Sequence, residues 1–214
     1  MKRRLMINKD ELPEKEILRL DAMMEYERAY SDCEYICGVD EVGRGPLAGP
    51  VVACAVILPK ETYYRYLNDS KKVTEKRREV LYDEITAEAV SYSLGVVSPQ
   101  VIDEINILQA TYRAMKEAVD GLSVRPDKIL VDAVHIPGID IPQVEIIKGD
   151  AKSVSIAAAS IVAKVYRDRM MVSYDELYPE YMFAKNKGYG TKVHMDVLRA
   201  QGLSPIHRKT FVHI

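Results

Sequence analysis

Residues 35–50 read YICGVDEVGRGPLAGP, in which an apolar run leads into two adjacent acids and then a glycine-rich turn. Asp40 and Glu41 stand side by side at the end of the run, where their charges repel each other unless a cation offsets them. Hard divalent cations take oxygen ligands, and glycines let the backbone approach a ligand closely. The segment therefore predicts a metal site beside a groove lined by backbone.

The glycine turn at residues 43–45 has a competing interpretation, the beginning of a dinucleotide-binding fingerprint. Here Pro46 follows the turn, and the third glycine, Gly49, is out of register. An apolar run typical of a strand then comes where the fingerprint needs a helix. The sequence context therefore disfavours a nicotinamide-binding site.

The composition is that of a soluble globular protein, with 48% hydrophobic and 29% charged residues among 214. This length suits one large domain, or one domain with a small appendage. No apolar run reaches the roughly 18 residues of a membrane span, and the basic residues at 1–4 lead into charged residues, so we expect a cytoplasmic location. Three cysteines fit reduced thiols. Cys33 and Cys37 could instead bind zinc, but no second Cys or His pair has zinc spacing.

A formal net charge of −2 argues against nucleic-acid binding through overall positive charge. It does not exclude a nuclease, because the acids of a metal site lower the total. The basic residues are grouped locally, which fits either phosphate contacts or ordinary solvated faces. The groups are Lys71, Lys72, Lys76, Arg77 and Arg78; Lys185, Lys187 and Lys192; and Arg208 and Lys209.

The apolar patterns predict helices and strands in alternation after an initial pair of strands. We expect strands at 35–40, 51–58, 91–97, 128–132 and 144–148, and helices at 13–30, from Thr74, at 98–121 and at 155–171. This order predicts an α/β fold with a mixed five-stranded sheet and helices on both faces. We expect an N-terminal helical segment at 1–34, a catalytic domain at 35–172 and a C-terminal helical extension at 173–214.

Three predicted strands lead to acids at Asp40, Asp132 and Asp150. Each acid alone could be a turn residue or a helix cap. Together with Glu41 they would gather four carboxylates at one sheet edge, and two Mg²⁺ or Mn²⁺ ions would offset the repulsion. Asp168, on the next predicted helix, could join them or pair with Lys164 one turn back.

Four segments resemble the motifs of the ribonuclease HII family: 38–49, 68–72, 148–168 and 187–191. The resemblance runs from about Tyr35 to Phe211. It implies a ribonuclease H-like fold with a C-terminal helical extension and hydrolysis of RNA in RNA–DNA hybrids. It further implies incision 5′ to single ribonucleotides in duplex DNA, leaving 3′-hydroxyl and 5′-phosphate ends.

The resemblance also assigns roles to residues. Asp40, Glu41, Asp132 and Asp150 match the metal-binding catalytic acids; the Gly43, Arg44 and Gly45 turn matches the element that senses the ribose 2′-hydroxyl; and Tyr189 matches the tyrosine that stacks on the adjacent deoxyribose. We expect Ser70 and Lys71, in a loop before a helix, to contact a phosphate. The chain departs from the family pattern at Ala133-Val134, where Gly-Asn is frequent, and at Asn186, where His is common.

Two rival functions remain open. One is a two-metal nuclease of the same fold that needs a longer RNA stretch; the other is a non-catalytic module that binds RNA–DNA hybrids. The turn together with Tyr189 argues against the first, and the intact acids argue against the second. We expect a monomer with a nucleic-acid partner and no membrane contact, and structural roles for the histidines, which are His135, His194, His207 and His213.

Overall fold

A mixed sheet of five strands organises the computed structural model, which describes residues 6–7 and 9–213. The strand order is β5-β3-β2-β6-β7, and β3 is antiparallel to both neighbours whereas β2, β6 and β7 run parallel. The bounds are β2 Ile36–Val42, β3 Val51–Ile57, β5 Ser91–Val97, β6 Lys128–Asp132 and β7 Gln143–Ile146. The predicted fold class is confirmed, including the mixed strand directions.

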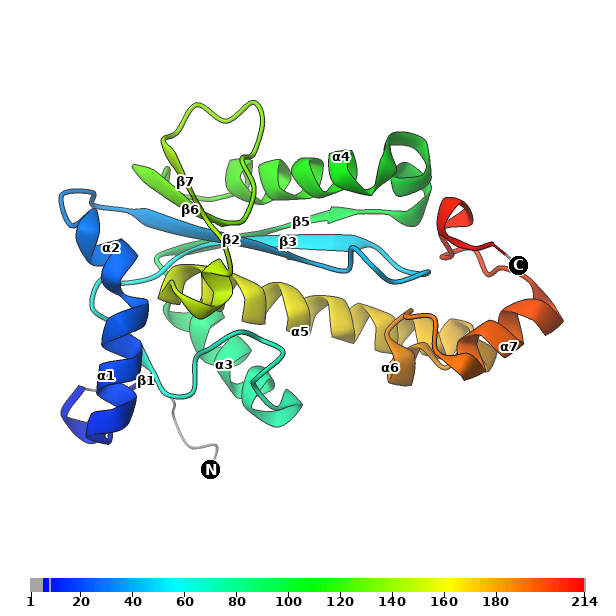
Figure 1. The fold of residues 1–214 in the computed structure, drawn as a ribbon, viewed down its shortest axis with the longest axis horizontal. Coiled ribbons are helices and arrows are strands. Elements are labelled where there is room, and N and C mark those ends of the chain that lie inside the picture. The colour runs from blue at the N-terminus through cyan, green and yellow to red at the C-terminus, as the bar shows by residue number, and fades with distance from the viewer. Residues whose placement is uncertain (1–5, 8, 214) are drawn as a thin grey trace.

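Helices cover both faces of this sheet (Figure 1). Helix α4 (Pro99–Asp120) packs on one face, and α3 (Glu75–Glu88) and α5 (Val154–Leu177) pack on the other. Strand β3 is buried on both sides because its residues alternate between the two cores. Val52, Cys54 and Val56 belong to the core beneath α3 and α5, while Val51, Ala53 and Ala55 belong to the core beneath α4.

The beginning of α5 lies very close to β2. A Cβ placed on Gly38 would stand 2.1 Å from the carbonyl carbon of Ser155, so only glycine permits this approach. The next turn of α5 presents small residues, and Ala157, Ala158 and Ala159 are all fully buried. This packing seats α5 directly behind the strand that carries the paired acids.

Several element bounds differ from those predicted. In place of one helix at 13–30, α1 (Glu14–Met23) and α2 (Glu25–Ala29) meet at a break at Met24. Helix α4 bends at Asn106, whose φ is 66° and whose side chain accepts hydrogen bonds from the N–H groups of Leu108 and Gln109. Asn106 thus caps the second half of the helix from inside. A small two-stranded sheet of β1 (Met6–Ile7) and β4 (Tyr63–Tyr64) was not anticipated.

Helix α5 ends at Leu177, later than the predicted 171, so the expected domain boundary after 172 falls within a helix. Short elements follow it, namely 3₁₀ turns at Pro179–Tyr181 and Lys209–Phe211 and the helices α6 (Phe183–Asn186) and α7 (Lys192–Gln201). Their apolar side chains share a cluster with Ala48 and Met171. The C-terminal region is therefore packed against the glycine-rich loop of residues 43–50. No helix within the described residues has the length and apolarity needed to cross a membrane.

Candidate active site

The predicted acids come together at one edge of the sheet. Asp132 is the last residue of β6, and Asp40 lies in β2 one residue beyond the last β2–β6 pair, Val39 with Val131. The backbone N–H of Gly149 donates to Oδ1 of Asp132 at 2.7 Å, which ties the turn carrying Asp150 to the end of β6. Three neighbouring strands thus deliver acids to one place, as expected for the carboxyl ends of parallel strands.

Two of the predicted strand ends are wrong in detail. Strand β2 continues past Asp40 to Val42, because its antiparallel pairing with β3 extends to Val52. Strand β7 stops at Ile146 and Asp150 sits beyond it in a 3₁₀ turn, Gly149–Ala151. The left-handed backbone of Lys148, with φ of 59°, ends the extended run.

The acids repel one another. Burial, and then the charge of Glu41, raise the pKa of Asp40 well above its ordinary range, with Asp132 adding to the effect. Burial also raises the pKa of Glu41, against the opposing Arg44 guanidinium 3.2 Å away. For Asp150, burial raises the pKa and the charges of Asp69 and Asp132 add to it. This edge of the sheet therefore carries surplus negative charge.

The chemistry of these donors fits a hard divalent cation, since all of them are carboxylate oxygens. Within residues 6–7 and 9–213, no three Asp, Glu, His or Cys side chains converge into one coordination shell. Three of the carboxylates accept from local donors: Asp40 Oδ1 from the N–H of Glu41 at 2.7 Å, Asp132 Oδ1 from the N–H of Gly149 at 2.7 Å, and Glu41 from the Arg44 guanidinium at 3.2 Å. Four oxygen-donor side chains thus stand near one another without sharing a single centre.

Sequence reasoning missed two residues of this site. Asp69 lies close enough to Asp150 to affect its pKa by hydrogen bonding and by charge. Ser160 on α5 hydrogen-bonds Asp40, and its hydroxyl also lies 3.0 Å from that of Ser70. Asp69 stands inside the motif at 68–72, so that motif was the signal for it. Ser160 stands inside the motif at 148–168, which was likewise the signal for it, and it sits next to buried alanines.

The two residues predicted to contact a phosphate, Ser70 and Lys71, lie in different surroundings. Ser70 is buried and its hydroxyl points to Ser160, so it lies in the layer beneath Asp40. Lys71 is exposed, and its charge lowers the pKa of nearby Asp150. Of the two residues considered on α5, Lys164 donates to Asp168 at 2.6 Å, and burial lowers the pKa of Lys164. The structure therefore contains the ion pair considered for Asp168.

Two buried arginines hold the glycine-rich loop of residues 43–50. Arg167 donates to the carbonyls of Pro50 at 3.0 Å and Ala48 at 3.1 Å, and to Lys187 at 3.0 Å. Arg208 donates to the carbonyls of Arg44 at 2.8 Å and Gly49 at 3.0 Å, and also to Gly43. Burial lowers the pKa of Arg167 to about 10 and that of Arg208 to about 9. The loop thus accepts hydrogen bonds from two guanidinium groups that are fully enclosed.

The turn at 43–45 and Tyr189 are neighbours, although 144 residues separate Gly45 from Tyr189. The Cε1 atom of Tyr189 is 3.9 Å from where a Cβ would stand on Gly45. Both residues are exposed, whereas Gly43 is buried with φ of 91° and leaves no room beside the Arg167 side chain. The turn and the tyrosine together form an open surface.

The two departures from the family pattern have local structural meaning. Asn186 is buried and joins the carbonyl of Tyr181, 2.6 Å from its Nδ2, to the N–H of Gly188, 2.8 Å from its Oδ1. Ala133 has a left-handed backbone with φ of 58°, a conformation that favours glycine.

Replacing Ala133 by Gly should therefore stabilise the protein. A left-handed conformation costs a non-glycine residue about 1–2 kcal/mol, part of which is offset by the greater entropy of glycine in the unfolded chain. We expect a gain of roughly 0.5–1 kcal/mol in the free energy of unfolding, measured by urea denaturation. Substituting Ala151 by Gly, in the neighbouring 3₁₀ turn where φ is not positive, is the matched control and should destabilise.

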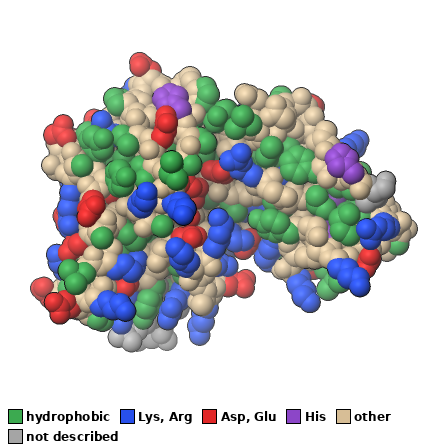
Figure 2. Space-filling view, viewed as in Figure 1, with side chains coloured by type: hydrophobic (Ala, Val, Ile, Leu, Met, Phe, Trp, Pro, Cys, Tyr) green, Lys and Arg blue, Asp and Glu red, His purple; other side chains and the backbone are tan. Residues whose placement is uncertain are grey.

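Basic side chains gather on one face of the molecule. Figure 2 shows Lys and Arg over α3 and the middle of α5, with Asp and Glu among them. Lys76, Arg77 and Arg78 lie in the first turn of α3, and Lys71 and Lys72 precede it. Such a face suits a polyanion laid across the acidic site.

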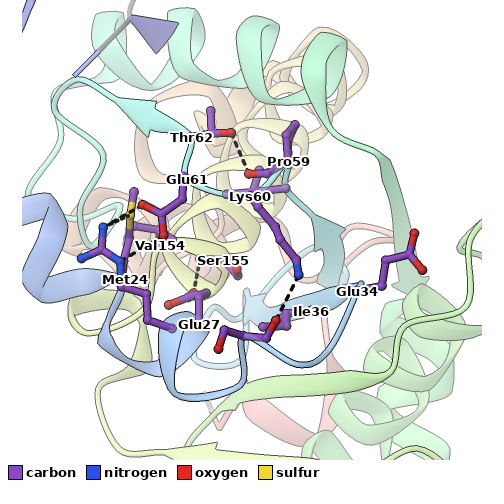
Figure 3. A pocket seen from close by; sticks show the side chains of 13 residues that line it. Met24, Glu27, Glu34, Ile36, Pro59, Lys60, Glu61, Thr62, Val154 and Ser155 are labelled. Carbon is purple, nitrogen blue, oxygen red and sulfur yellow. Dashed lines mark hydrogen bonds and ion pairs between the residues drawn. The ribbon is translucent and has the colours of Figure 1, made fainter. Parts of the chain in front are cut away.

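A separate pocket lies between α2 and the segment at 58–62 (Figure 3). Glu27 on its wall accepts hydrogen bonds from the Ser153 hydroxyl at 2.6 Å and the Ser155 N–H at 3.0 Å, which anchors the beginning of α5. Lys60 donates to the carbonyl of Ser31 at 3.3 Å. The residues that line this pocket include none of those predicted for the site.

Comparison with known proteins places this chain in a family. The family model described as Ribonuclease HII matches residues 37–214. A curated relative, "Ribonuclease HII" of Lachnoclostridium phytofermentans, is 61% identical over 194 residues, which cover 91% of this chain and 76% of the relative.

Solved structures share the fold. Ribonuclease HII of Archaeoglobus fulgidus, solved in complex with PCNA, has a TM-score of 0.69 and 26% identity, covering 84% of this chain and 96% of the other. A ribonuclease HIII (Bst-RNase HIII), solved with Mn²⁺, has a TM-score of 0.63 at 18% identity and covers 83% of this chain and 67% of the other. The second likeness supports the fold alone.

Proposed function

Because the chain belongs to the ribonuclease HII family, endoribonucleases that hydrolyse RNA in RNA–DNA hybrids with divalent metal ions, we propose that its four clustered acids hold those ions. The acids are Asp40, Glu41, Asp132 and Asp150. The observation that carries this proposal is geometric: neighbouring strands β2 and β6 bring Asp40 and Asp132 to one sheet edge, and the Gly149 N–H ties the turn that carries Asp150 to Asp132. The raised pKa of Asp40, Glu41 and Asp150 agrees with this crowding of carboxylates. We propose two ions, Mg²⁺ or Mn²⁺. When bound, such ions activate a water and stabilise the leaving oxygen.

The protein itself supplies position and charge. Ser160 lies beside Asp40 and lowers the pKa of that carboxyl, the Ser160 hydroxyl donates to that of Ser70 at 3.0 Å, and the N–H of Gly149 holds the carboxylate of Asp132. Lys71 and the basic first turn of α3 would contact backbone phosphates beside the acids. Residues of this kind bind the duplex without reading its sequence, so we expect little base preference near the cut.

Recognition of a ribonucleotide requires contact with its 2′-hydroxyl, which is both donor and acceptor. We assign this to the turn of Gly43, Arg44 and Gly45, with the Tyr189 ring on the adjacent deoxyribose. Support comes from the position of Tyr189 against Gly45, from Arg208, which donates to the carbonyls of Gly43 and Arg44, and from Arg167, which holds the rest of the loop of residues 43–50. We further propose incision 5′ to a single embedded ribonucleotide, leaving 3′-hydroxyl and 5′-phosphate ends, as the family resemblance implies.

The experiment compares three duplexes: DNA with one ribonucleotide, an RNA–DNA hybrid, and DNA alone. Wild-type enzyme with Mg²⁺ or Mn²⁺ should cut the first two and spare the third, and chelator should abolish cutting. Tyr189→Ala should reduce single-ribonucleotide incision roughly tenfold to a hundredfold, from loss of about 1–3 kcal/mol of stacking. Tyr189→Phe, the matched control, keeps the ring and should lose far less.

Equal cutting of the single-ribonucleotide duplex by Tyr189→Ala and wild type would remove the assigned role of Tyr189. Binding of hybrid without metal-dependent cleavage would instead favour the non-catalytic alternative. The expected cytoplasmic location and monomeric state stay predictions.

A further inference from the structure

Two histidines of the C-terminal region are hydrogen-bonded to each other, and neither has a role in the proposed reaction. His194 on α7 and His207 are both buried, and their Nε2 atoms lie 2.9 Å apart. The stacked rings of Tyr181 and Phe183 enclose them, with the centroid of Tyr181 at 4.9 Å from His207 and that of Phe183 at 5.5 Å from His194. A buried polar pair of this kind is stable only if every hydrogen bond is matched.

The outer partners of the pair determine where each proton lies. The Nδ1 atom of His194 is 2.9 Å from the carbonyl oxygen of Tyr189, which only accepts, so His194 carries its proton on Nδ1. The Nδ1 atom of His207 accepts from the N–H of Ser204 at 2.9 Å and lies 2.7 Å from the Ser204 hydroxyl, which can also donate to it. His207 therefore carries its proton on Nε2 and donates it to His194. Both rings are then neutral. Burial favours this state, since it lowers the pKa of His194 and, with His194 nearby, that of His207 to about 4.

This chain of hydrogen bonds joins the two sides of the recognition surface. At one end it holds the peptide of Tyr189. At the other it holds the segment 204–208, which pairs with the glycine-rich loop: the N–H of Gly49 donates to Ile206 at 2.9 Å, and that of Arg208 to Leu47 at 2.9 Å. The N–H of Leu47 in turn donates to the carbonyl of Gly188, next to Tyr189, at 2.8 Å. The histidine pair thus closes a ring of contacts around the turn and the tyrosine.

We propose that His194 and His207 are positioning residues that set Tyr189 against the 43–45 turn through one defined pair of tautomers. The inference rests on the proposed role of Tyr189 in recognising the ribonucleotide junction. Two χ angles separate the Tyr189 ring from its peptide, so a fixed peptide is needed to hold an exposed ring in place. The Tyr189 carbonyl also accepts from the N–H of Thr191 at 2.8 Å, and the Tyr189 N–H donates to Asn186 at 2.9 Å, so the His194 contact is the one that ties Tyr189 to the segment 204–208. We expect its loss to shift the Tyr189 peptide, and a shift of about 1 Å at a recognition element can cost up to 100-fold in rate.

A double-mutant cycle tests this. His207→Leu and His207→Gln are each made in the wild-type and Tyr189→Ala backgrounds, and kcat and KM are measured on duplex DNA with one ribonucleotide. His207→Leu should lower kcat/KM roughly tenfold or more in wild type and have little further effect with Tyr189→Ala, since coupled residues are non-additive. His207→Gln restores an N–H donor toward His194 and should recover most of the loss. His213→Leu, an exposed histidine, is the matched control and should match wild type.

The outcomes separate the two proposals. If Tyr189→Ala alone has no effect, the assigned role of Tyr189 fails and the inference falls with it. If Tyr189→Ala is impaired but His207→Leu is not, only the inference is overturned. The same holds if His207→Leu lowers kcat/KM by the same factor in the wild-type and Tyr189→Ala backgrounds. Histidine ¹⁵N spectra of the wild-type protein test it without any variant: we expect the Nδ1–H form for His194 and the Nε2–H form for His207. An Nε2–H form for His194 would overturn it.

Discussion

Asp40→Asn should reduce cleavage of an RNA–DNA hybrid by roughly 10³-fold or more while leaving the fold intact. In the wild-type protein the N–H of Glu41 donates to the Asp40 carboxylate at 2.7 Å, and Ser160 lies beside it. The side-chain oxygen of Asn can accept from the same groups. It removes the negative charge that would hold a cation, and metal stabilisation of phosphoryl transfer contributes several kcal/mol, with about 1.4 kcal/mol for each factor of ten. Single-turnover cleavage with saturating Mg²⁺ measures the loss.

The same variant should be at least as stable as wild type when chelator is present. Burial and Glu41 raise the pKa of folded Asp40 well above its ordinary 3.8. The unfolded chain therefore releases this proton first as pH rises, so ionisation above pH 3.8 favours unfolding. The melting temperature of Asp40→Asn should equal or exceed that of wild type at neutral pH, and any advantage should vanish as the pH falls toward 3.8.

Asp120→Asn is the matched control, since the exposed carboxylate of Asp120 pairs with Lys116 on the surface of α4. It should change stability by less than about 1 kcal/mol and leave cleavage unchanged. Retained cleavage by Asp40→Asn would contradict the assigned metal site, and a lower melting temperature at neutral pH would contradict the electrostatic account of the acid cluster.

Arg208→Met should destabilise the protein by about 3 kcal/mol or more. Its guanidinium donates to the carbonyls of Gly43, Arg44 and Gly49. Methionine fills similar space but donates nothing, and each buried acceptor left without a partner costs about 1–3 kcal/mol. Urea denaturation measures the free energy of unfolding. Cleavage of single-ribonucleotide duplex should fall as well, because the 43–45 turn loses its support.

Two comparisons make the Arg208 result specific. Arg208→Lys keeps the charge, but one ammonium reaches fewer carbonyls than the planar guanidinium, so we expect an intermediate loss. Arg113→Met removes an exposed arginine that pairs with Glu117 on α4, and it should cost less than about 1 kcal/mol. If Arg208→Met were no worse than Arg113→Met, the loop would not depend on this buried group.

Much of the fold was predictable because local sequence patterns carry it. The fully buried run of β3 and the positions of β5 and β6 are seen directly as apolar and alternating residues. The early end of β7 was not, because it depends on the left-handed backbone of Lys148, which no propensity for lysine predicts. The bend in α4 similarly depends on one side chain, Asn106, capping its own helix.

The amino-acid sequence by itself determined the acids, the glycine turn and their family, because chemistry of this kind requires particular residue types in a particular order. Only the tertiary structure decided that Ser70 faces inward to Ser160, that Arg167 and Arg208 support the loop of residues 43–50, and that His194 is hydrogen-bonded to His207. The physical reason is that a buried polar group must find its partner in space, and these partners lie up to 165 residues away along the chain.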